Sequence, residues 1–264
     1  MQDDDQIRHS HADELEVDHD PEIIARQEAA NALRQATLVR TKVEEAARTG
    51  QRRLRPATIL ELNRSAIGGL SRYAGVWRPG PVRIEKAEHT PPDAGIVPYL
   101  IEDMCDYINE AWSDKSPVHL AAYVMWRLNW IHPFFDGNGR TARATSYYVL
   151  CLRLGYALPG TLTIPEQIVK NRLPYYDALE CADRVCSRDG PTAENVVAEM
   201  ESLLAAMLAT QLKSAFDEAV VQQSSHASES ERLIKSLSDE AQETADVVES
   251  LYRSIKRDDG EPTR

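Results

Sequence analysis

The chain has 264 residues, of which 42% are apolar and 27% are charged, and its formal net charge is −12. This balance is typical of a globular protein with a sizeable core, and the negative charge argues against a nucleic-acid-binding protein, because phosphate backbones attract basic surfaces. The longest apolar run, residues 146–152, is too short to span a bilayer, so we expect no membrane segment.

The first 20 residues differ in charge from the rest of the chain. They hold eight acidic side chains and one arginine, a net charge of −7, which leaves −5 for the remaining 244 residues. Such an acidic and nearly aromatic-free stretch predicts a disordered tail. Its histidines, His9, His11 and His19, could bind a metal, although a solvated tail is the simpler interpretation.

Helical patterns dominate the residues that follow. Residues 21–49 have apolar positions at helical spacing and end at Gly50, a residue type that commonly stops helices, so we assign residues 21–54 to an N-terminal helix. A second helix is expected after Pro56. Further helices are expected over residues 96–112, 116–130, 141–154, 171–185, 192–220 and 230–257. The fold class is therefore all-α.

One stretch, residues 73–95, is rich in glycine and proline and does not follow a helical pattern. Its strand-like residues 82–84 and a second arm near Glu85–His89 predict a small β-hairpin.

The cysteines and the amino terminus bear on the compartment. The four cysteines form no CxxC pair and lie in apolar helical contexts, which is typical of reduced core thiols in a cytoplasmic protein. They are Cys105, Cys151, Cys181 and Cys186. The acidic amino terminus also lacks the apolar segment of a signal peptide, so we expect a cytoplasmic location.

The most informative stretch is residues 131–143, IHPFFDGNGRTAR. Gly137 and Gly139 precede a long predicted helix, where glycines let backbone N–H groups turn toward a ligand and the helix amino terminus adds partial positive charge. Arg140 and Arg143 are three residues apart and therefore share a helix face. Together these residues predict a site for an anion the size of a polyphosphate.

Three neighbouring side chains add chemistry to this anion site. Asp136 could hold Mg²⁺, which prefers a carboxylate together with phosphate oxygens. Asn138 could donate to a phosphate oxygen, and His132 could accept the proton of an attacking hydroxyl. These are the parts that phosphoryl or nucleotidyl transfer requires.

Each residue also has a simpler interpretation. A lone histidine is more often a satisfied core residue than a base, and the sequence DGNG is usually a turn. It also begins like a calcium loop, but Arg140 stands where that loop needs an oxygen ligand. Paired arginines are usually solvated, and Phe134 is interpreted as a packing residue. The combination, not any single residue, favours transfer chemistry.

The sequence HPFFDGNGR followed by Arg143 resembles the signature of the Fic (Fido) family, HPFx[D/E]GN[G/K]R followed by xxR, at each specified position. The resemblance extends over roughly Arg55–Leu212. There GVWRPGPVRI…HTPP is similar to the segment before the family's β-hairpin flap, and LPYYDALECAD is similar to a helix with adenine-pocket residues. It implies a Fic-type helical bundle as the catalytic core at 55–212, followed by a helical extension over 213–264.

The resemblance implies transfer of AMP from ATP to a Ser, Thr or Tyr hydroxyl of a protein substrate, with pyrophosphate as the leaving group. His132 would be the general base, Asp136 would hold Mg²⁺ between the α- and β-phosphates, and Arg143 would grip the γ-phosphate. The anion hole would be formed by Gly137, Asn138, Gly139 and Arg140.

Weaker resemblances suggest further contacts. The flap residues Ala87, Glu88 and His89 would contact the target protein, and Tyr175 and Tyr176 would contact the adenosine. Asp183 stands where an asparagine is common in relatives, so an adenine contact there does not follow from the resemblance.

Other reactions of the same family stay open. One branch phosphorylates its targets and resembles HPFxDANKR, whereas Gly137 and Gly139 stand here in place of its Ala and Lys. Because glycine leaves room for the orientation that transfers AMP, we favour adenylylation. UMP transfer and the removal of AMP from targets are alternatives.

Regulation is the least determined feature. Many relatives are silenced by a helix with the motif [S/T]xxxE[G/N], and an alanine follows the glutamate in Thr41–Glu45, Ser214–Glu218 and Ser236–Glu240. We therefore hypothesise that the chain escapes self-inhibition or is held by a separate antitoxin-like chain. The near-heptad spacing of residues 230–257 could also support a homodimer, although a packing helix is the simpler interpretation.

Overall fold

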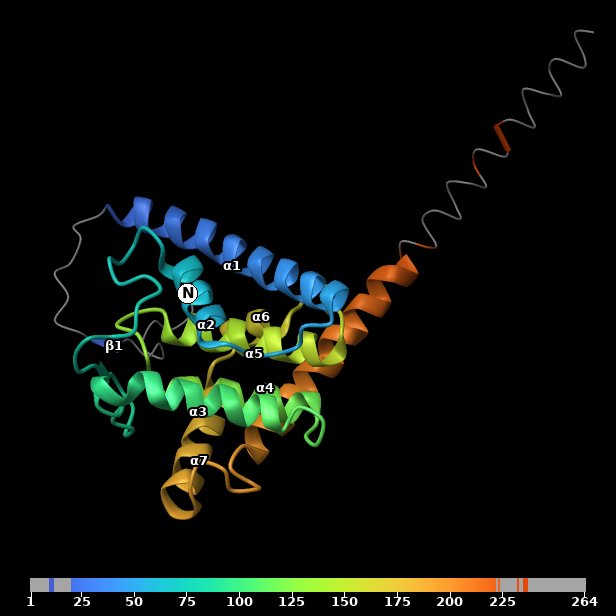
Figure 1. Cartoon of the computed structure of the whole chain (residues 1–264). Coiled ribbons are helices and arrows are strands. Elements are labelled where there is room, and N and C mark those ends of the chain that lie inside the picture. Colours follow the sequence, from blue (N-terminus) through green and yellow to red (C-terminus); the bar gives the residue numbers. More distant parts are fainter. Residues whose placement is uncertain (1–9, 12–19, 222, 224–231, 233–234, 237–264) are drawn as a thin grey trace, which may run out of the picture. The chain divides into compact units, whose positions relative to one another are not determined.

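The structure, a computed structural model, describes residues 10–11, 20–221, 223, 232 and 235–236 (Figure 1). The chain divides into two compact units, Met1–Leu212 and Lys213–Arg264. In the second unit residues 213–221 are helical. Most of the predicted helix 230–257, and with it the hypothesis of a homodimer contact, lies outside the described residues.

The all-α prediction is confirmed for the first unit. Its helices are α1 (Pro21–Thr49), α2 (Pro56–Ile67), α3 (Val97–Glu110), α4 (Pro117–Ile131), α5 (Asn138–Leu154), α6 (Ile164–Lys170) and α7 (Leu173–Asp189). A short 3₁₀ helix, Ala94–Ile96, precedes α3, and residues 198–212 form another helix. None of the described helices is both long enough and apolar enough to cross a bilayer.

Local sequence explains where these helices start and stop. The Asp20 carboxylate accepts a hydrogen bond from the Glu22 N–H, and proline at the first position of α1 has no N–H that would need a partner. The Ser116 hydroxyl caps α4 in the same way, at 2.9 Å from the His119 N–H. Gly50 ends α1 as predicted, because its left-handed φ of 72° suits glycine.

Helices α4 and α5 form the centre of the core. They pack against each other, and α1 and α2 cover α5, as Figure 1 shows. Their fully buried side chains include Leu120, Met125, Trp126, Ile131 and Val149. Burial of each such side chain contributes about 1.5–3 kcal/mol. The loop 132–137 therefore joins the two most deeply buried helices, which fixes both of its ends.

The predicted β-hairpin is wrong in its pairing. Strand β2 (Arg83–Ile84) pairs antiparallel with β1 (Ser10–His11), with Ser10 opposite Ile84 and His11 opposite Arg83. The residues after β2 turn instead of forming a second arm, because Lys86 has a φ of 56°. The predicted tail disorder is therefore wrong at Ser10–His11, and the other residues of 1–19 lie outside the described part.

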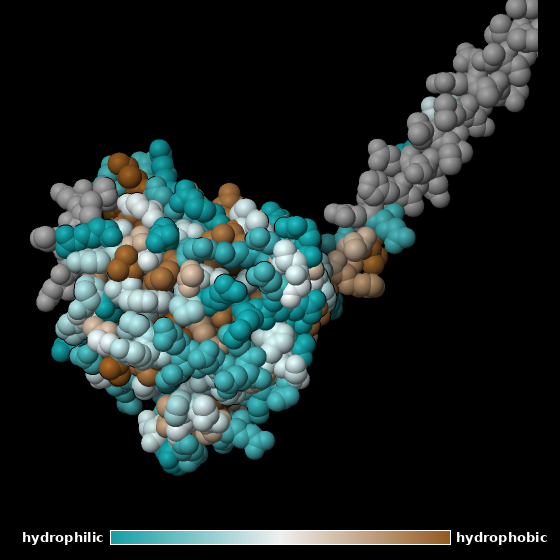
Figure 2. All heavy atoms as spheres, in the orientation of Figure 1, coloured by the Kyte–Doolittle hydropathy of each residue, from teal (hydrophilic) through white to brown (hydrophobic). Residues whose placement is uncertain are grey.

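The surface and the thiols follow ordinary patterns. Polar residues predominate on the face shown in Figure 2, and apolar residues are scattered over it. All four cysteines are free thiols, and Cys105 and Cys151 are buried. Cys181 and Cys186 are only half-buried, so the prediction of core thiols is correct for the first pair alone.

Candidate active site

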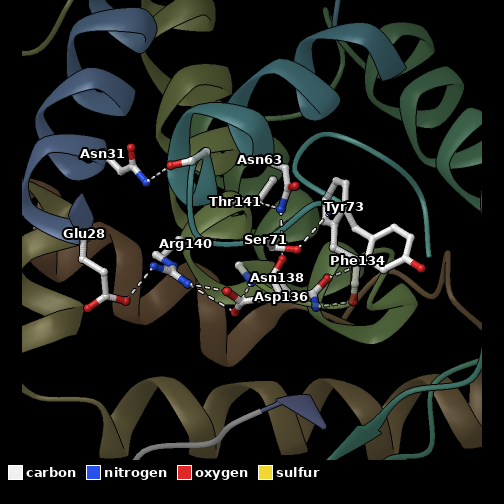
Figure 3. A network of polar contacts seen from close by, with 12 residues as sticks. Glu28, Asn31, Asn63, Ser71, Tyr73, Phe134, Asp136, Asn138, Arg140 and Thr141 are labelled. Carbon is white, nitrogen blue, oxygen red and sulfur yellow. Dashed lines mark hydrogen bonds and ion pairs between the residues drawn. The ribbon is translucent and has the colours of Figure 1, made fainter. Parts of the chain in front are cut away.

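The loop between α4 and α5 is held closed by one side chain. The buried Asn138 accepts a hydrogen bond from the Phe134 N–H at 2.9 Å and donates to the Phe134 carbonyl at 2.8 Å. The oxygen and one N–H of its side-chain amide are used in this way (Figure 3). The backbone N–H of Asn138 lies in the first turn of α5, where it has no acceptor within the helix.

A second buried asparagine, Asn63 of α2, connects this loop to the preceding one. It donates to the Asp136 carbonyl at 3.0 Å and accepts from the Gly75 N–H at 2.8 Å (Figure 3). Asn63 was not singled out from the sequence. The available signal was a single asparagine on the apolar face of a predicted helix, where a polar group has to find a partner.

His132 ends α4 in a left-handed conformation, with φ 52° and ψ 58°, which is uncommon for a residue other than glycine. Its side chain is buried, and Nδ1 lies 3.3 Å from the Asn129 carbonyl oxygen. Because a carbonyl can only accept, this contact places the proton on Nδ1 and the lone pair on Nε2. A neutral imidazole in this tautomer is the form that can accept a proton at Nε2.

The pKa of His132 is lowered to about 3, mainly by burial; the bond to the Asn129 carbonyl raises this pKa, whereas the neighbouring Arg78 and His89 lower it. The pKa of this histidine in the unfolded chain is near 6.5. Between pH 6.5 and 3, His132 is therefore protonated in the unfolded chain and neutral in the folded chain. We expect the free energy of unfolding to fall across this window, by up to about 1.4 kcal/mol per pH unit from this residue.

Urea unfolding at several pH values would measure this slope. Wild type and His132→Asn should diverge below pH 6.5, because the variant has no group to protonate at this position. Two parallel stability curves would contradict the expectation.

The residues of the predicted anion site lie at the amino terminus of α5. The first backbone N–H groups of a helix have no acceptor within it and point toward a ligand. Gly137 has a φ of 76°, and a Cβ there would lie 2.7 Å from Cγ2 of Ile67. A Cβ at Gly139 would lie 3.2 Å from Nη1 of Arg143, so the second glycine leaves space for this guanidinium.

Arg143 is the deepest cation of the site. Burial lowers its pKa, as do the neighbouring Arg172 and Arg140, whereas Tyr175 and Tyr176 raise it. Within the part of the chain that the structure describes, no carboxylate forms an ion pair with Arg143. Three neighbouring arginines, of which the half-buried Arg143 lacks a carboxylate partner among the described residues, favour an anionic ligand. Arg172, which precedes α7, was not singled out from the sequence.

Arg140 is engaged differently. Its guanidinium lies 2.9 Å from Oδ2 of Asp136 and 3.0 Å from Oε1 of Glu28, which belongs to α1 (Figure 3). Glu28 is thus the α1 carboxylate that contacts the motif. Glu45, considered above as part of an inhibitory motif, lies about 25 Å further along the same helix.

Binding of a metal ion at this site would require oxygen atoms from a bound nucleotide in addition to protein side chains. Asp136 supplies one half-exposed carboxylate, and no cluster of three or more His, Cys, Asp or Glu side chains suited to a metal occurs among the described residues. Mg²⁺ usually keeps waters and binds one or two carboxylates together with phosphate oxygens. The donor set therefore fits Mg²⁺ that arrives with a nucleotide, and does not fit an all-protein cage.

Two cavities flank the site. One of about 880 Å³ lies beside Arg140 and Arg143 and is lined mainly by α1, α5 and residues 157–170. The other, of about 470 Å³, is lined by residues 87–90 and by polar residues of α7, including Asp183. The predicted target contacts Ala87, Glu88 and His89 all line this second cavity.

The predicted nucleotide contacts on α7 occupy unequal positions. Tyr175 is buried, and its hydroxyl accepts a hydrogen bond from Asn129 at 2.8 Å. Tyr176 is half-buried, with its ring centre 5.5 Å from that of Tyr175. Asp183 accepts from Nε1 of Trp126 at 2.8 Å. The structure thus brings Tyr175 and Tyr176 to Arg143, while their contact with a nucleotide stays a prediction.

Comparison with known proteins gives a consistent picture. Residues 53–150 match the Fic/DOC family. Over 127 residues, or 47% of this chain, the sequence is 35% identical to the protein adenylyltransferase Fic of Drosophila willistoni. It is 36% identical over the same length to the protein of the same name from Drosophila persimilis. The chain spans about a quarter of the length of these curated relatives, 24% and 23%.

Solved structures resemble the fold. A Fic-domain-containing signalling protein of Bacteroides thetaiotaomicron aligns with a TM-score of 0.58 at 23% identity, over 74% of this chain and 73% of that one. A Fic family protein of Desulfovibrio desulfuricans aligns with a TM-score of 0.50 at 21% identity, over 78% of this chain and 56% of that one. At these identities the likeness concerns the fold.

Proposed function

We propose that the chain, whose residues 53–150 match the Fic/DOC family, is a Fic-type protein adenylyltransferase. It would transfer AMP from ATP to a Ser, Thr or Tyr hydroxyl of another protein. The observation that supports this best is the placement of His132 and Arg143 at opposite ends of one short loop and helix turn. The base and the anion site are thereby fixed to the same buried helix pair, α4 and α5.

The reaction needs one bond exchange at the α-phosphorus. The hydroxyl oxygen of the target forms a bond to this phosphorus, the bond to the bridging oxygen of the β-phosphate breaks, and pyrophosphate leaves. The hydroxyl proton passes to Nε2 of His132, which is neutral at pH 7 because burial lowers the pKa of His132.

The remaining residues bind and orient the nucleotide. The backbone N–H groups of Asn138, Gly139 and Arg140 would donate hydrogen bonds to phosphate oxygens. Arg143 would neutralise the charge of the terminal phosphates. Asp136 would hold Mg²⁺, which when bound would offset phosphate charge. The half-buried Tyr176 would contact the adenosine. The cavity beside Asp183 would bind the target protein, and the reaction would take place in the cytoplasm.

Labelled ATP tests the proposal directly. The protein is incubated with Mg²⁺, a bacterial lysate and ATP labelled at the α- or at the γ-phosphate, with His132→Ala in parallel. We expect protein bands labelled from the α-phosphate alone, and only with wild type. Label from the γ-phosphate would instead identify a kinase, and label from neither would contradict the proposed use of ATP.

Glu28 is expected to weaken nucleotide binding, because its carboxylate and the phosphates compete for Arg140. Replacing Glu28 with glutamine should tighten ATP binding by up to about fivefold, since half-exposed ion pairs contribute about 0.2–1 kcal/mol. Titration calorimetry measures this affinity. Glu22→Gln is a matched control, since Glu22 is a carboxylate of the same helix that pairs with Arg26. An equal change in both variants would indicate a general charge effect.

A further inference from the structure

A buried arginine outside the motif contacts the end of α4. Arg78 is 2% exposed, and its Nε donates to the carbonyl of His132 at 2.8 Å. Its own backbone N–H donates to the Pro133 carbonyl at 2.9 Å. Side chain and main chain of Arg78 therefore both hold the turn that contains the candidate base.

The other arms of the guanidinium bind a different segment. Nη1 donates to the carbonyl of Gly80 at 3.0 Å, and Nη2 donates to the carbonyl of Pro92. Between Gly80 and Pro92 lie β2 and residues 87–90, which line one side of the cavity of about 470 Å³. We call residues 80–92 the flap segment. Arg78 thus binds both ends of the flap segment and the carbonyl of His132 with one side chain.

This arrangement suits an arginine and no other residue type. A guanidinium has five N–H donors in a rigid plane, whereas a lysine ammonium is a single point on a flexible stem and cannot reach three separated carbonyls. The position at the carboxyl end of α4 also favours a cation, because the helix dipole is negative there. Burial nevertheless lowers the pKa of Arg78, with Asp93 raising it, so the charge is kept at a cost in free energy.

A second side chain of this region, His89, also links the flap segment to the end of α4. Nε2 of His89, in the flap segment, lies 2.7 Å from the carbonyl of Trp130, and the two rings lie 5.3 Å apart. A residue near the carboxyl end of the flap segment is thereby bound to Trp130, two residues before His132. Arg78 and His89 therefore hold the flap segment against the same helix terminus at three points.

We propose that Arg78 is a positioning residue that fixes the flap segment relative to His132, so that a hydroxyl aligned by the segment reaches the base. Within the described part of the chain, the guanidinium donates to three backbone carbonyls, and it takes no part in bond exchange. This inference rests on the proposed function for its chemical meaning, while the mechanical link between Arg78 and the flap segment can be measured without any reaction.

Amide hydrogen exchange tests the mechanical link. In Arg78→Lys and Arg78→Met we expect exchange within the flap segment to accelerate at least about tenfold, while the central helices α4 and α5 exchange as in wild type. Asn109→Ala is the matched control, because Asn109 also clasps a loop by two backbone contacts, to the N–H and carbonyl of Leu54, both at 2.9 Å. It should leave the flap segment unchanged. Unchanged exchange in both Arg78 variants would overturn the proposal.

Labelling from α-phosphate-labelled ATP tests the functional meaning. With dilute bacterial lysate as the source of targets, Arg78→Lys should label about tenfold more slowly than wild type, and the difference should narrow as the lysate is concentrated. The affinity for ATP should stay unchanged. A loss of ATP affinity that accounts for slower labelling would overturn the positioning role. If wild type transfers no label, the proposed function fails, and the exchange result still decides whether Arg78 holds the flap segment.

Discussion

Replacing His132 with alanine is expected to lower the rate of AMP transfer by about 10²–10⁴-fold, the usual contribution of a general base. ATP binding should change little, because the anion site belongs to the α5 amino terminus and its arginines. The rate of label transfer from the α-phosphate and the ATP affinity from calorimetry measure the two effects separately.

His119 offers a control on the same helix. It is also a buried histidine of α4, and it contacts Oε1 of Glu201 at 2.6 Å and the hydroxyl of Tyr107 at 2.9 Å, away from the loop 132–137. His119→Ala should destabilise the fold, since it leaves the half-buried Glu201 and Tyr107 without this partner, but should retain transfer at a temperature where it stays folded. Equal losses of activity in both variants would contradict the assignment of His132 as the base.

Replacing Arg143 with methionine is expected to have opposite effects on activity and on stability. Transfer should fall by at least about 10²-fold, because the variant loses the cation that neutralises the terminal phosphates. The fold should become more stable, by up to about 1 kcal/mol, because methionine fills similar space and removes a half-buried cation that has no carboxylate partner among the described residues. Urea unfolding and the α-label assay measure the two effects.

Arg140→Met distinguishes this expectation from a general effect of removing charge. Arg140 has two carboxylate partners, Asp136 and Glu28, so its removal leaves both without their cation and should not stabilise the fold. A gain in stability in both variants, or in neither, would contradict the interpretation that Arg143 is kept at a cost for binding an anion.

The sequence was sufficient to predict most helices of the first unit, although not α6. Helix starts and stops depend on local chemistry, so Gly50 and Ser116 mark predicted boundaries that the structure confirms. The proximity of His132 to the α5 amino terminus also follows from the sequence, because only a short loop separates them. The resemblance to the Fic family could be recognised because the motif is contiguous.

Contacts between distant segments were beyond sequence reasoning. Arg78 and Asn63 bind backbone carbonyls, which every residue has, so no side-chain pattern marks their partners. The partner of β2 was mispredicted for a related reason. A strand of two residues has too little alternation to specify its register, and a nearby second arm was the simplest assumption.

The pairing of β1 with β2 has a consequence for recognition. On one side of β2, the backbone groups that could accept an added strand are already used by Ser10–His11 of the same chain. A tethered strand competes at an effective concentration of about millimolar, depending on the length of its tether. An extended segment of another protein would therefore pair with this edge only if it binds β2 more strongly than Ser10–His11 does. Unfolded chains that bind more weakly would not displace β1.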